Sequence, residues 1–290
     1  MGVAKTRLTN PICLQRLTSK RYCLYMNRET PSPQSNGKII GSATLQGGTP
    51  AAGIHLAAPA GNGHSQTLRD AESSLMRKIF RRCHRAMVAA THNTLLPVEF
   101  LVALTANESG GNPKASRFEP GVYTHLMAVA TGKSAAYGAI TQHLLEQQME
   151  AEARGKGAEY HGLFLNQAFA LNHSAALAGI AQEGLRELAT SWGFTQIMGY
   201  HVVGSSSTVQ DLLNPDLHYP VTVRLLSEFG RAFGLDLGRD FEALLRCWNS
   251  GHPAGKTFDP LYVENGLRRM KEYDAMLKEA DAANAAQGES

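Results

Sequence analysis

The sequence has few cysteines and no long apolar run. Its four cysteines lie far apart, and no pair has the Cys-x-x-Cys spacing of a structural metal site. No stretch approaches the ~20 apolar residues that cross a bilayer. Lysines and arginines interrupt every apolar segment near the N-terminus, so no secretory signal is recognisable. From these absences we expect no structural metal site and no stable membrane insertion.

Charge is also scarce, at 18% of residues, and the net charge of +3 is unevenly distributed. Residues 1–40 hold seven Lys and Arg and a single acid, Glu29. Residues 41–290 carry a slight excess of acids instead. Nucleic-acid-binding domains concentrate basic side chains on the folded part of the chain. The charge distribution therefore predicts no nucleic-acid partner.

Several catalytic motifs are missing as well. Neither Gly-x-Ser-x-Gly nor His-Glu-x-x-His occurs, so a serine hydrolase or a zinc protease is not supported. The segment 251–257 reads GHPAGKT, but Ser250 stands where a phosphate loop requires its first glycine. The eleven histidines show no metal-ligand spacing. We therefore expect no metal and no other cofactor.

The chain divides into a leader and a helical body. Residues 1–68 hold the basic excess and a long Gly-, Pro- and Ser-rich stretch, which predicts a flexible leader. From residue 69 on, apolar residues recur at helical spacing and β-branched alternation is rare. This pattern predicts an all-α domain over 69–283, with a helical insertion over about 121–175 and a tail at 284–290. The other helices are expected over 68–91, 97–109, 174–190, 220–233, 240–248 and 260–283.

Glu108 has the most informative position in this body. At 100° per residue it lies within about 20° of Leu101, so a carboxyl group shares the apolar face of the helix expected over 97–109. It also lies in the last helical turn. Burial and the negative potential of a helix C-terminus both favour the protonated carboxyl group, the form that a general acid requires. The alternative is a solvent-exposed Glu at a frayed helix end.

Three segments resemble, in order, the motifs of one enzyme family. Residues 108–115 read ESGGNPKA, residues 191–200 read SWGFTQIMGY and residues 247–251 read CWNSG. They are similar to the Glu-Ser-x-x-Asn-Pro-x-Ala, Gly-x-x-Gln-Ile-Met and Tyr-Asn-Ala-Gly elements of lytic transglycosylases and N-acetylmuramidases. The resemblance spans roughly residues 95–275 and implies a lysozyme-like fold. The 88 positions between Glu108 and Gln196 are nearer to the muramidase arrangement.

The resemblance implies cleavage of the β-1,4 bond between N-acetylmuramic acid and N-acetylglucosamine in peptidoglycan. Glu108 would be the proton donor. In a lytic transglycosylase the same Glu then activates the sugar's 6-hydroxyl, whereas in a hydrolase a second acid positions water. Glu119, in the RFEP segment, is the leading candidate for that second acid. The residues implied to bind the glycan strand are Ser191, Gln196, Met198, Tyr200, Asn249 and Tyr262.

Most of these roles have a structural alternative. An ion pair could hold Glu119, hydrogen bonds to the backbone could hold Gln196, and Ser191 could shape a turn. Core packing could explain Met198, Tyr200 and Tyr262.

Two other functions stay open at this stage. One is a degenerate lysozyme-like module that binds cell-wall glycan without cutting it. The other is a structural component of a phage or secretion machine. An enzyme would act in the cell envelope or outside the cell, reached from the cytoplasm by phage-type or other non-standard export. The sequence does not indicate an oligomeric state.

Overall fold

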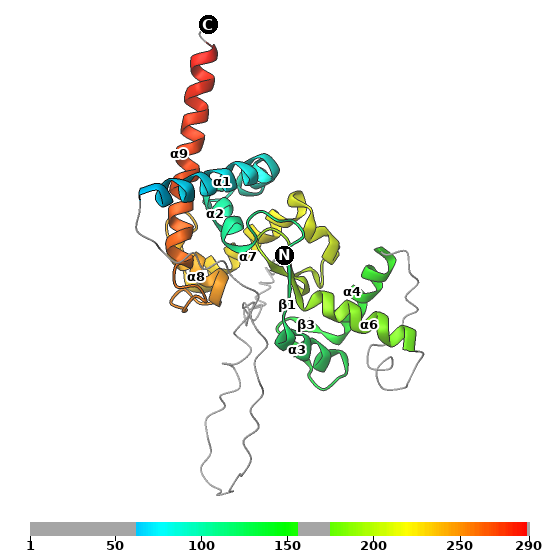
Figure 1. Ribbon diagram of the computed structural model, residues 1–290. Coiled ribbons are helices and arrows are strands. Elements are labelled where there is room, and N and C mark those ends of the chain that lie inside the picture. Colours follow the sequence, from blue (N-terminus) through cyan, green and yellow to red (C-terminus); the bar gives the residue numbers. More distant parts are fainter. Residues whose placement is uncertain (1–61, 156–174, 289–290) are drawn as a thin grey trace, which may run out of the picture.

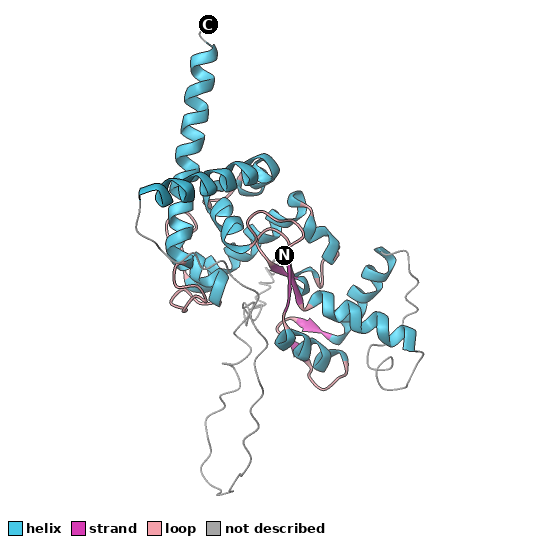
Figure 2. Cartoon of the chain, in the orientation of Figure 1, coloured by secondary structure: helices cyan, strands magenta, loops and turns pink. Residues whose placement is uncertain are grey.

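The computed structural model describes residues 62–155 and 175–288 (Figure 1). Over these residues the chain is mainly helical with little sheet, which confirms the all-α prediction at that level (Figure 2). Most of the predicted leader, and the last part of the predicted insertion, residues 156–174, lie outside the described residues. None of the described helices is both long and apolar enough to cross a bilayer.

The observed helices agree with the predicted ones in position, with differences at their ends. The first helix begins at Asn62, so the boundary predicted at residue 68 lies inside a helix. The last helix continues to Gly288 and takes in most of the predicted tail. The helices are α1 (Asn62–Thr91), α2 (Val98–Glu108), α3 (Pro120–Ala130), α4 (Gln142–Gly155), α6 (Ala175–Leu188), α7 (Pro215–Phe233), α8 (Phe241–Ser250) and α9 (Tyr262–Gly288).

Short strands interrupt the helices at places that the sequence did not indicate. An antiparallel sheet has the order β1 (Ser116–Phe118), β4 (Thr190–Trp192), β5 (Ile197–Met198). The hairpin β2 (Ala136–Tyr137) and β3 (Ile140–Thr141) separates α3 from α4. Two or three residues are too few to show a strand period, so pattern reading assigned these segments to helices or loops.

The core consists of two clusters of buried side chains. The first cluster is formed mainly by α1, α2, α8 and α9, and the second by α3, α4, α6 and the sheet. Helix α7 contributes to both, with Leu226 in the first cluster and Leu225 in the second. Trp248 packs against both clusters. Figure 1 shows the two groups of helices side by side, with α7 between them.

Helix α2 runs through the first cluster. Every residue from Phe100 to Ala106 is buried, and the helix packs along α9 and α1. Pro97 precedes its first turn, and two glycines with left-handed backbone, Gly110 and Gly111, follow its end. A Cβ on Gly111 would lie 2.8 Å from the Ile79 side chain, so only glycine allows this close approach. The observed bounds differ from the predicted 97–109 by one residue at each end.

Candidate functional site

Glu108 is the last residue of α2, and its carboxylate accepts a hydrogen bond from the hydroxyl group of Tyr262. The distance from the hydroxyl oxygen to Glu108 Oε1 is 2.5 Å. Tyr262 is the first residue of α9 and is only 6% exposed. Burial, reinforced by the charge and hydrogen bond of Glu108, raises the pKa of Tyr262 well above its ordinary value. The hydroxyl group therefore stays protonated and orients the half-buried carboxylate.

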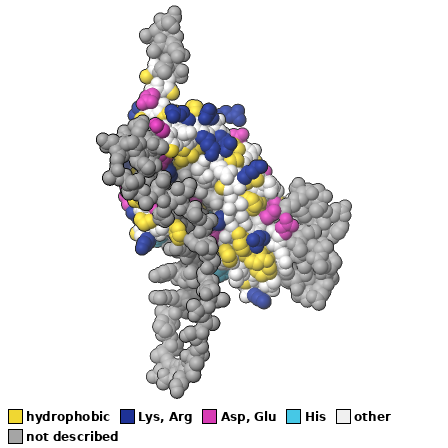
Figure 3. Space-filling model, viewed as in Figure 1, with side chains coloured by type: hydrophobic (Ala, Val, Ile, Leu, Met, Phe, Trp, Pro, Cys, Tyr) yellow, Lys and Arg dark blue, Asp and Glu magenta, His cyan; other side chains and the backbone are white. Residues whose placement is uncertain are grey.

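Two basic residues of α1 hold the turn that follows Glu108. Lys78 Nζ donates to the Gly110 carbonyl oxygen at 3.3 Å, and an Arg82 guanidinium nitrogen donates to that of Gly111 at 2.9 Å. Figure 3 shows Lys and Arg side chains gathered on the face where α1 runs. On the other side of the turn, Ser109 Oγ donates to the carbonyl oxygen of Phe194 at 2.6 Å. The turn is thus tied both to α1 and to the loop between β4 and β5.

The amide group of Gln196 is engaged within this β4–β5 loop. Its Nε2 donates to the carbonyl oxygens of Ala115, at 3.0 Å, and Gly193, at 2.9 Å. Its Oε1 accepts from Ser191 Oγ at 3.0 Å. Gln196 also has a left-handed backbone with φ of 59°, which is uncommon for a residue other than glycine. These bonds are the structural alternatives named above for both side chains, and contact with a sugar stays a prediction.

His218 of α7 fixes the same loop from inside the protein. Its Nε2 accepts from the Thr195 backbone N–H at 2.9 Å, and its Nδ1 donates to the Leu212 carbonyl oxygen at 2.8 Å. Burial lowers the pKa of His218 to about 4, so the ring is neutral and can accept this bond. Trp248 Nε1 donates to the Thr195 carbonyl oxygen at 3.0 Å. Sequence reasoning missed His218, because a lone histidine has no spacing signal.

Met198 and Tyr200 are both buried in the second cluster. Tyr200 meets the ring of Tyr137 edge-on, with 5.5 Å between the ring centroids. Asn249 Oδ1 accepts from the Phe258 backbone N–H at 3.0 Å and so holds the segment before α9. All three side chains therefore have structural contacts. Their contact with a glycan strand stays a prediction.

Glu119 follows β1 and occupies the N-cap position of α3. Its Oε1 accepts from Arg117 Nε at 2.8 Å, and a second guanidinium nitrogen lies at 2.6 Å. Its backbone N–H donates to the Ala189 carbonyl oxygen at 2.9 Å, beside the start of β4. The ion pair named as an alternative for Glu119 is therefore present.

Among the side chains that the structure describes, no group of three or more His, Cys, Asp or Glu could hold a metal ion. Cys83 and Cys247 are buried free thiols, and Cys13 and Cys23 lie outside the described ranges. The chemistry that the site offers is proton transfer by a carboxyl group, which a tyrosine hydroxyl orients.

Comparison with family models, with curated proteins and with solved structures gives no match for this chain. The central fact is that three segments distant in the sequence meet at one place. Ser109, directly after the helix that carries Glu108, contacts Phe194, and Trp248 contacts Thr195 of the same loop.

Proposed function

We propose that this protein cleaves the glycan strand of peptidoglycan, with Glu108 as the general acid of a lysozyme-like domain. The observation that carries the proposal is that hydrogen bonds join the three motif segments to one another, beginning at the residue after Glu108. Ser109, directly after Glu108, bonds to the second segment at Phe194, and the second segment bonds to the third at Trp248. These contacts support the proposal, because residues that act on one substrate must lie at one place in the fold.

The chemistry follows from the position of one carboxyl group. Glu108 gives its proton to the oxygen that links N-acetylmuramic acid to the next sugar, and the C1–O bond breaks. An oxocarbenium-like centre develops at C1, and the N-acetyl group of the sugar can stabilise it. The Glu108 carboxylate then takes a proton from the attacking hydroxyl group, which restores the acid.

The attacking group decides the product. If the sugar's own 6-hydroxyl attacks C1, the product is a 1,6-anhydro sugar and no second carboxylate is needed. If water attacks, the product has a reducing end, and Glu119 would position the water. The Arg117 ion pair holds one oxygen of Glu119, so a role in hydrolysis would fall to its other oxygen.

Tyr262 supports the proposed role of Glu108 in two ways. Its hydroxyl group fixes the carboxyl group in one direction, so the proton is delivered to one place. A hydrogen bond to the ionised carboxylate is charge-assisted and stabilises the form that exists after proton transfer.

The test is digestion of purified sacculi by the wild-type chain and by Glu108→Gln. The substitution keeps the shape of the side chain and removes the proton, so release of soluble muropeptides should fall by about 10²-fold or more. Glu99→Gln is the matched control, because Glu99 lies in the first turn of the same helix. Mass spectrometry of the released fragments separates anhydro ends from reducing ends.

Full activity of Glu108→Gln would refute the assigned role of Glu108. A wild-type chain that binds sacculi and releases nothing would instead be a glycan-binding module.

A further inference from the structure

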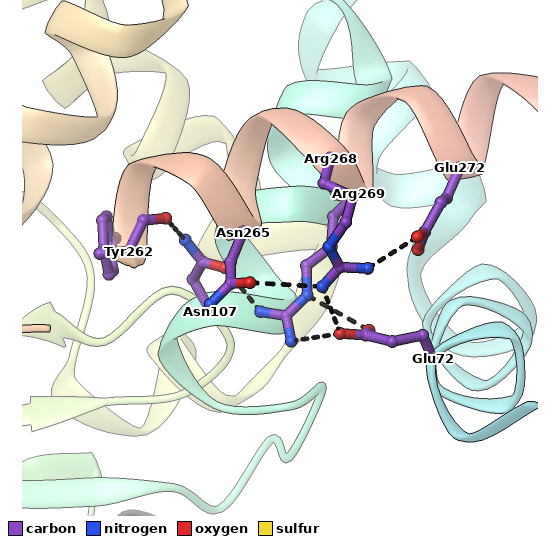
Figure 4. A network of polar contacts seen from close by, with 7 residues as sticks. All are labelled: Glu72, Asn107, Tyr262, Asn265, Arg268, Arg269 and Glu272. Carbon is purple, nitrogen blue, oxygen red and sulfur yellow. Dashed lines mark hydrogen bonds and ion pairs between the residues drawn. The ribbon is translucent and has the colours of Figure 1, made fainter. Parts of the chain in front are cut away.

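Asn107 directly precedes Glu108 and contacts the backbone of Tyr262, the tyrosine whose hydroxyl group bonds to Glu108. Asn107 Nδ2 donates to the backbone carbonyl oxygen of Tyr262 at 2.8 Å (Figure 4). The hydroxyl group of Tyr262 bonds to Glu108. Two consecutive residues of α2 therefore hold the two ends of one tyrosine. Helices α2 and α9 also approach closely here, because a Cβ on Gly266 of α9 would lie 3.3 Å from Asn107 Nδ2.

The orientation of the Asn107 amide is set by a charged partner. An Arg269 guanidinium nitrogen donates to Asn107 Oδ1 at 2.6 Å. A cation can bond only to the oxygen end of an amide, so the NH₂ end must face the Tyr262 carbonyl group. Arg269 and the Tyr262 carbonyl group require the same orientation of the amide, and without Arg269 only the weaker, neutral hydrogen bond to the carbonyl would hold the Asn107 side chain.

Arg269 is held in turn by Glu72 of α1. Two of its nitrogens bond to the Glu72 carboxylate, at 2.9 Å and 3.3 Å. The side chains are only 16% and 20% exposed, so the pair is well shielded from water. Burial raises the pKa of Glu72, but the hydrogen bonds from Arg269 and Arg268 outweigh it, and the pKa is lowered overall. Glu72 therefore stays ionised and anchors Arg269.

We propose that Glu72, Arg269 and Asn107 are positioning residues that hold the Tyr262 hydroxyl group on the Glu108 carboxylate. For its effect on catalysis the proposal rests on the function proposed above, but the positioning itself does not. The chain of contacts links three helices, from α1 through α9 to the end of α2 (Figure 4). Removing a remote member should therefore change the behaviour of Tyr262, not only the stability of the fold.

The neighbouring residue Arg268 provides a matched control. It also bonds to Glu72, at 2.7 Å, but its other close partner is Glu272 at 2.6 Å, and no bond to Asn107 is present. Arg268→Gln and Arg269→Gln each remove an ion pair between α1 and α9. Only Arg269→Gln also removes the bond that orients Asn107.

The first readout needs no substrate. The chain is labelled with ¹³Cζ-tyrosine, and the resonance of Tyr262 is assigned as the one missing from Tyr262→Phe. In the wild-type background this resonance should move when Glu108→Gln replaces the carboxylate acceptor by an amide, and this movement is the response that is measured. An Arg269→Gln background should lose the response, and an Arg268→Gln background should keep it.

Asn107→Asp is a second variant in case Arg269→Gln does not fold. It keeps the acceptor for Arg269 but loses the donor to the Tyr262 carbonyl, so it should also lose the response. Glu72→Gln as a single substitution should reduce the response. In an Arg269→Gln background it should cause no further reduction, because Glu72 acts through Arg269.

The second readout is activity on sacculi. Arg269→Gln should lower kcat about tenfold with little change in KM, whereas Arg268→Gln should leave both close to wild type. Equal effects of the two arginine variants on the Tyr262 resonance would overturn the proposal, because the cluster would then only tie α1 to α9. If Glu108→Gln kept full activity, the proposed function would fail, and the resonance would still decide the positioning proposal.

Discussion

His218 should make the stability of this protein depend on pH, and the structure gives the sign and the size. The neutral ring accepts the Thr195 N–H, and burial lowers the pKa of His218 from its ordinary 6.5 to about 4. In the unfolded chain the ring takes up a proton as the pH falls below about 6.5. The unfolded state therefore binds more protons than the folded state between these values, and acid favours unfolding.

The size follows from the pKa difference. Each unit corresponds to about 1.4 kcal/mol, so His218 should remove about 3 kcal/mol from the free energy of unfolding between pH 7 and pH 4. His218→Gln cannot show this loss. At pH 7 the variant should be less stable than the wild type by about 1–3 kcal/mol, because it loses buried hydrogen bonds. This difference should shrink by about 3 kcal/mol as the pH falls to 4.

The assay is urea unfolding followed by tryptophan fluorescence at several pH values from 7 to 4. Burial also lowers the pKa of His201, to about 3, but this contribution is common to both proteins and cancels in the comparison. His92→Gln, at an exposed site after α1, is the control and should retain the wild-type slope. Parallel pH profiles for the wild type and His218→Gln would refute the reasoning.

Three other substitutions test the site. Tyr262→Phe removes the donor that orients Glu108, so kcat on sacculi should fall about tenfold with little change in KM. Gly193→Ala brings a Cβ too close to the Leu212 carbonyl oxygen, at a residue with left-handed backbone. Thermal unfolding should show that the free energy of unfolding falls by about 2–4 kcal/mol. Gln196→Glu removes two donors to backbone carbonyls, and urea unfolding should show a loss of about 2–3 kcal/mol.

Each of these has a control in the chain. Tyr219→Phe removes a hydroxyl group that bonds to Thr105 of the same helix, and kcat should stay close to wild type. Gly132→Ala has a left-handed backbone but no neighbour within 4 Å, so it should cost less than Gly193→Ala. Gln210→Glu, on an exposed side chain, should leave stability close to wild type. Equal losses within a pair would contradict the role assigned to that site.

Local signals explain why some predictions from the sequence were accurate. The apolar spacing from residue 98 on and the Gly110–Gly111 stop place α2 within one residue at each end. The same pattern put Glu108 at the end of a buried helix. Periodicity and helix stops depend on residues a few positions apart, so both can be found in a single sequence.

Other features had no local signal. The strand β4 has three residues, and its hydrogen bonds go to β1 and β5 rather than along its own segment. The left-handed backbone of Gln196 is held by a hydrogen bond from its side-chain amide to the carbonyl oxygen of Ala115, which is far away in the chain. Such features form only when distant backbone groups meet in the fold. The spacing of residue types along the sequence does not predict such contacts.

The sequence by itself therefore determined the mainly helical composition, the order of the helices and the choice of Glu108 as the residue to examine. Only the tertiary structure decided what surrounds that residue. It brought Tyr262 to the carboxylate from 154 positions away and Arg269 to Asn107 from 162 positions away. Helix formation is governed by contacts within a turn or two, whereas the partners of a buried charge are chosen by how whole helices pack. That packing, not the motif alone, gives Glu108 its fixed orientation.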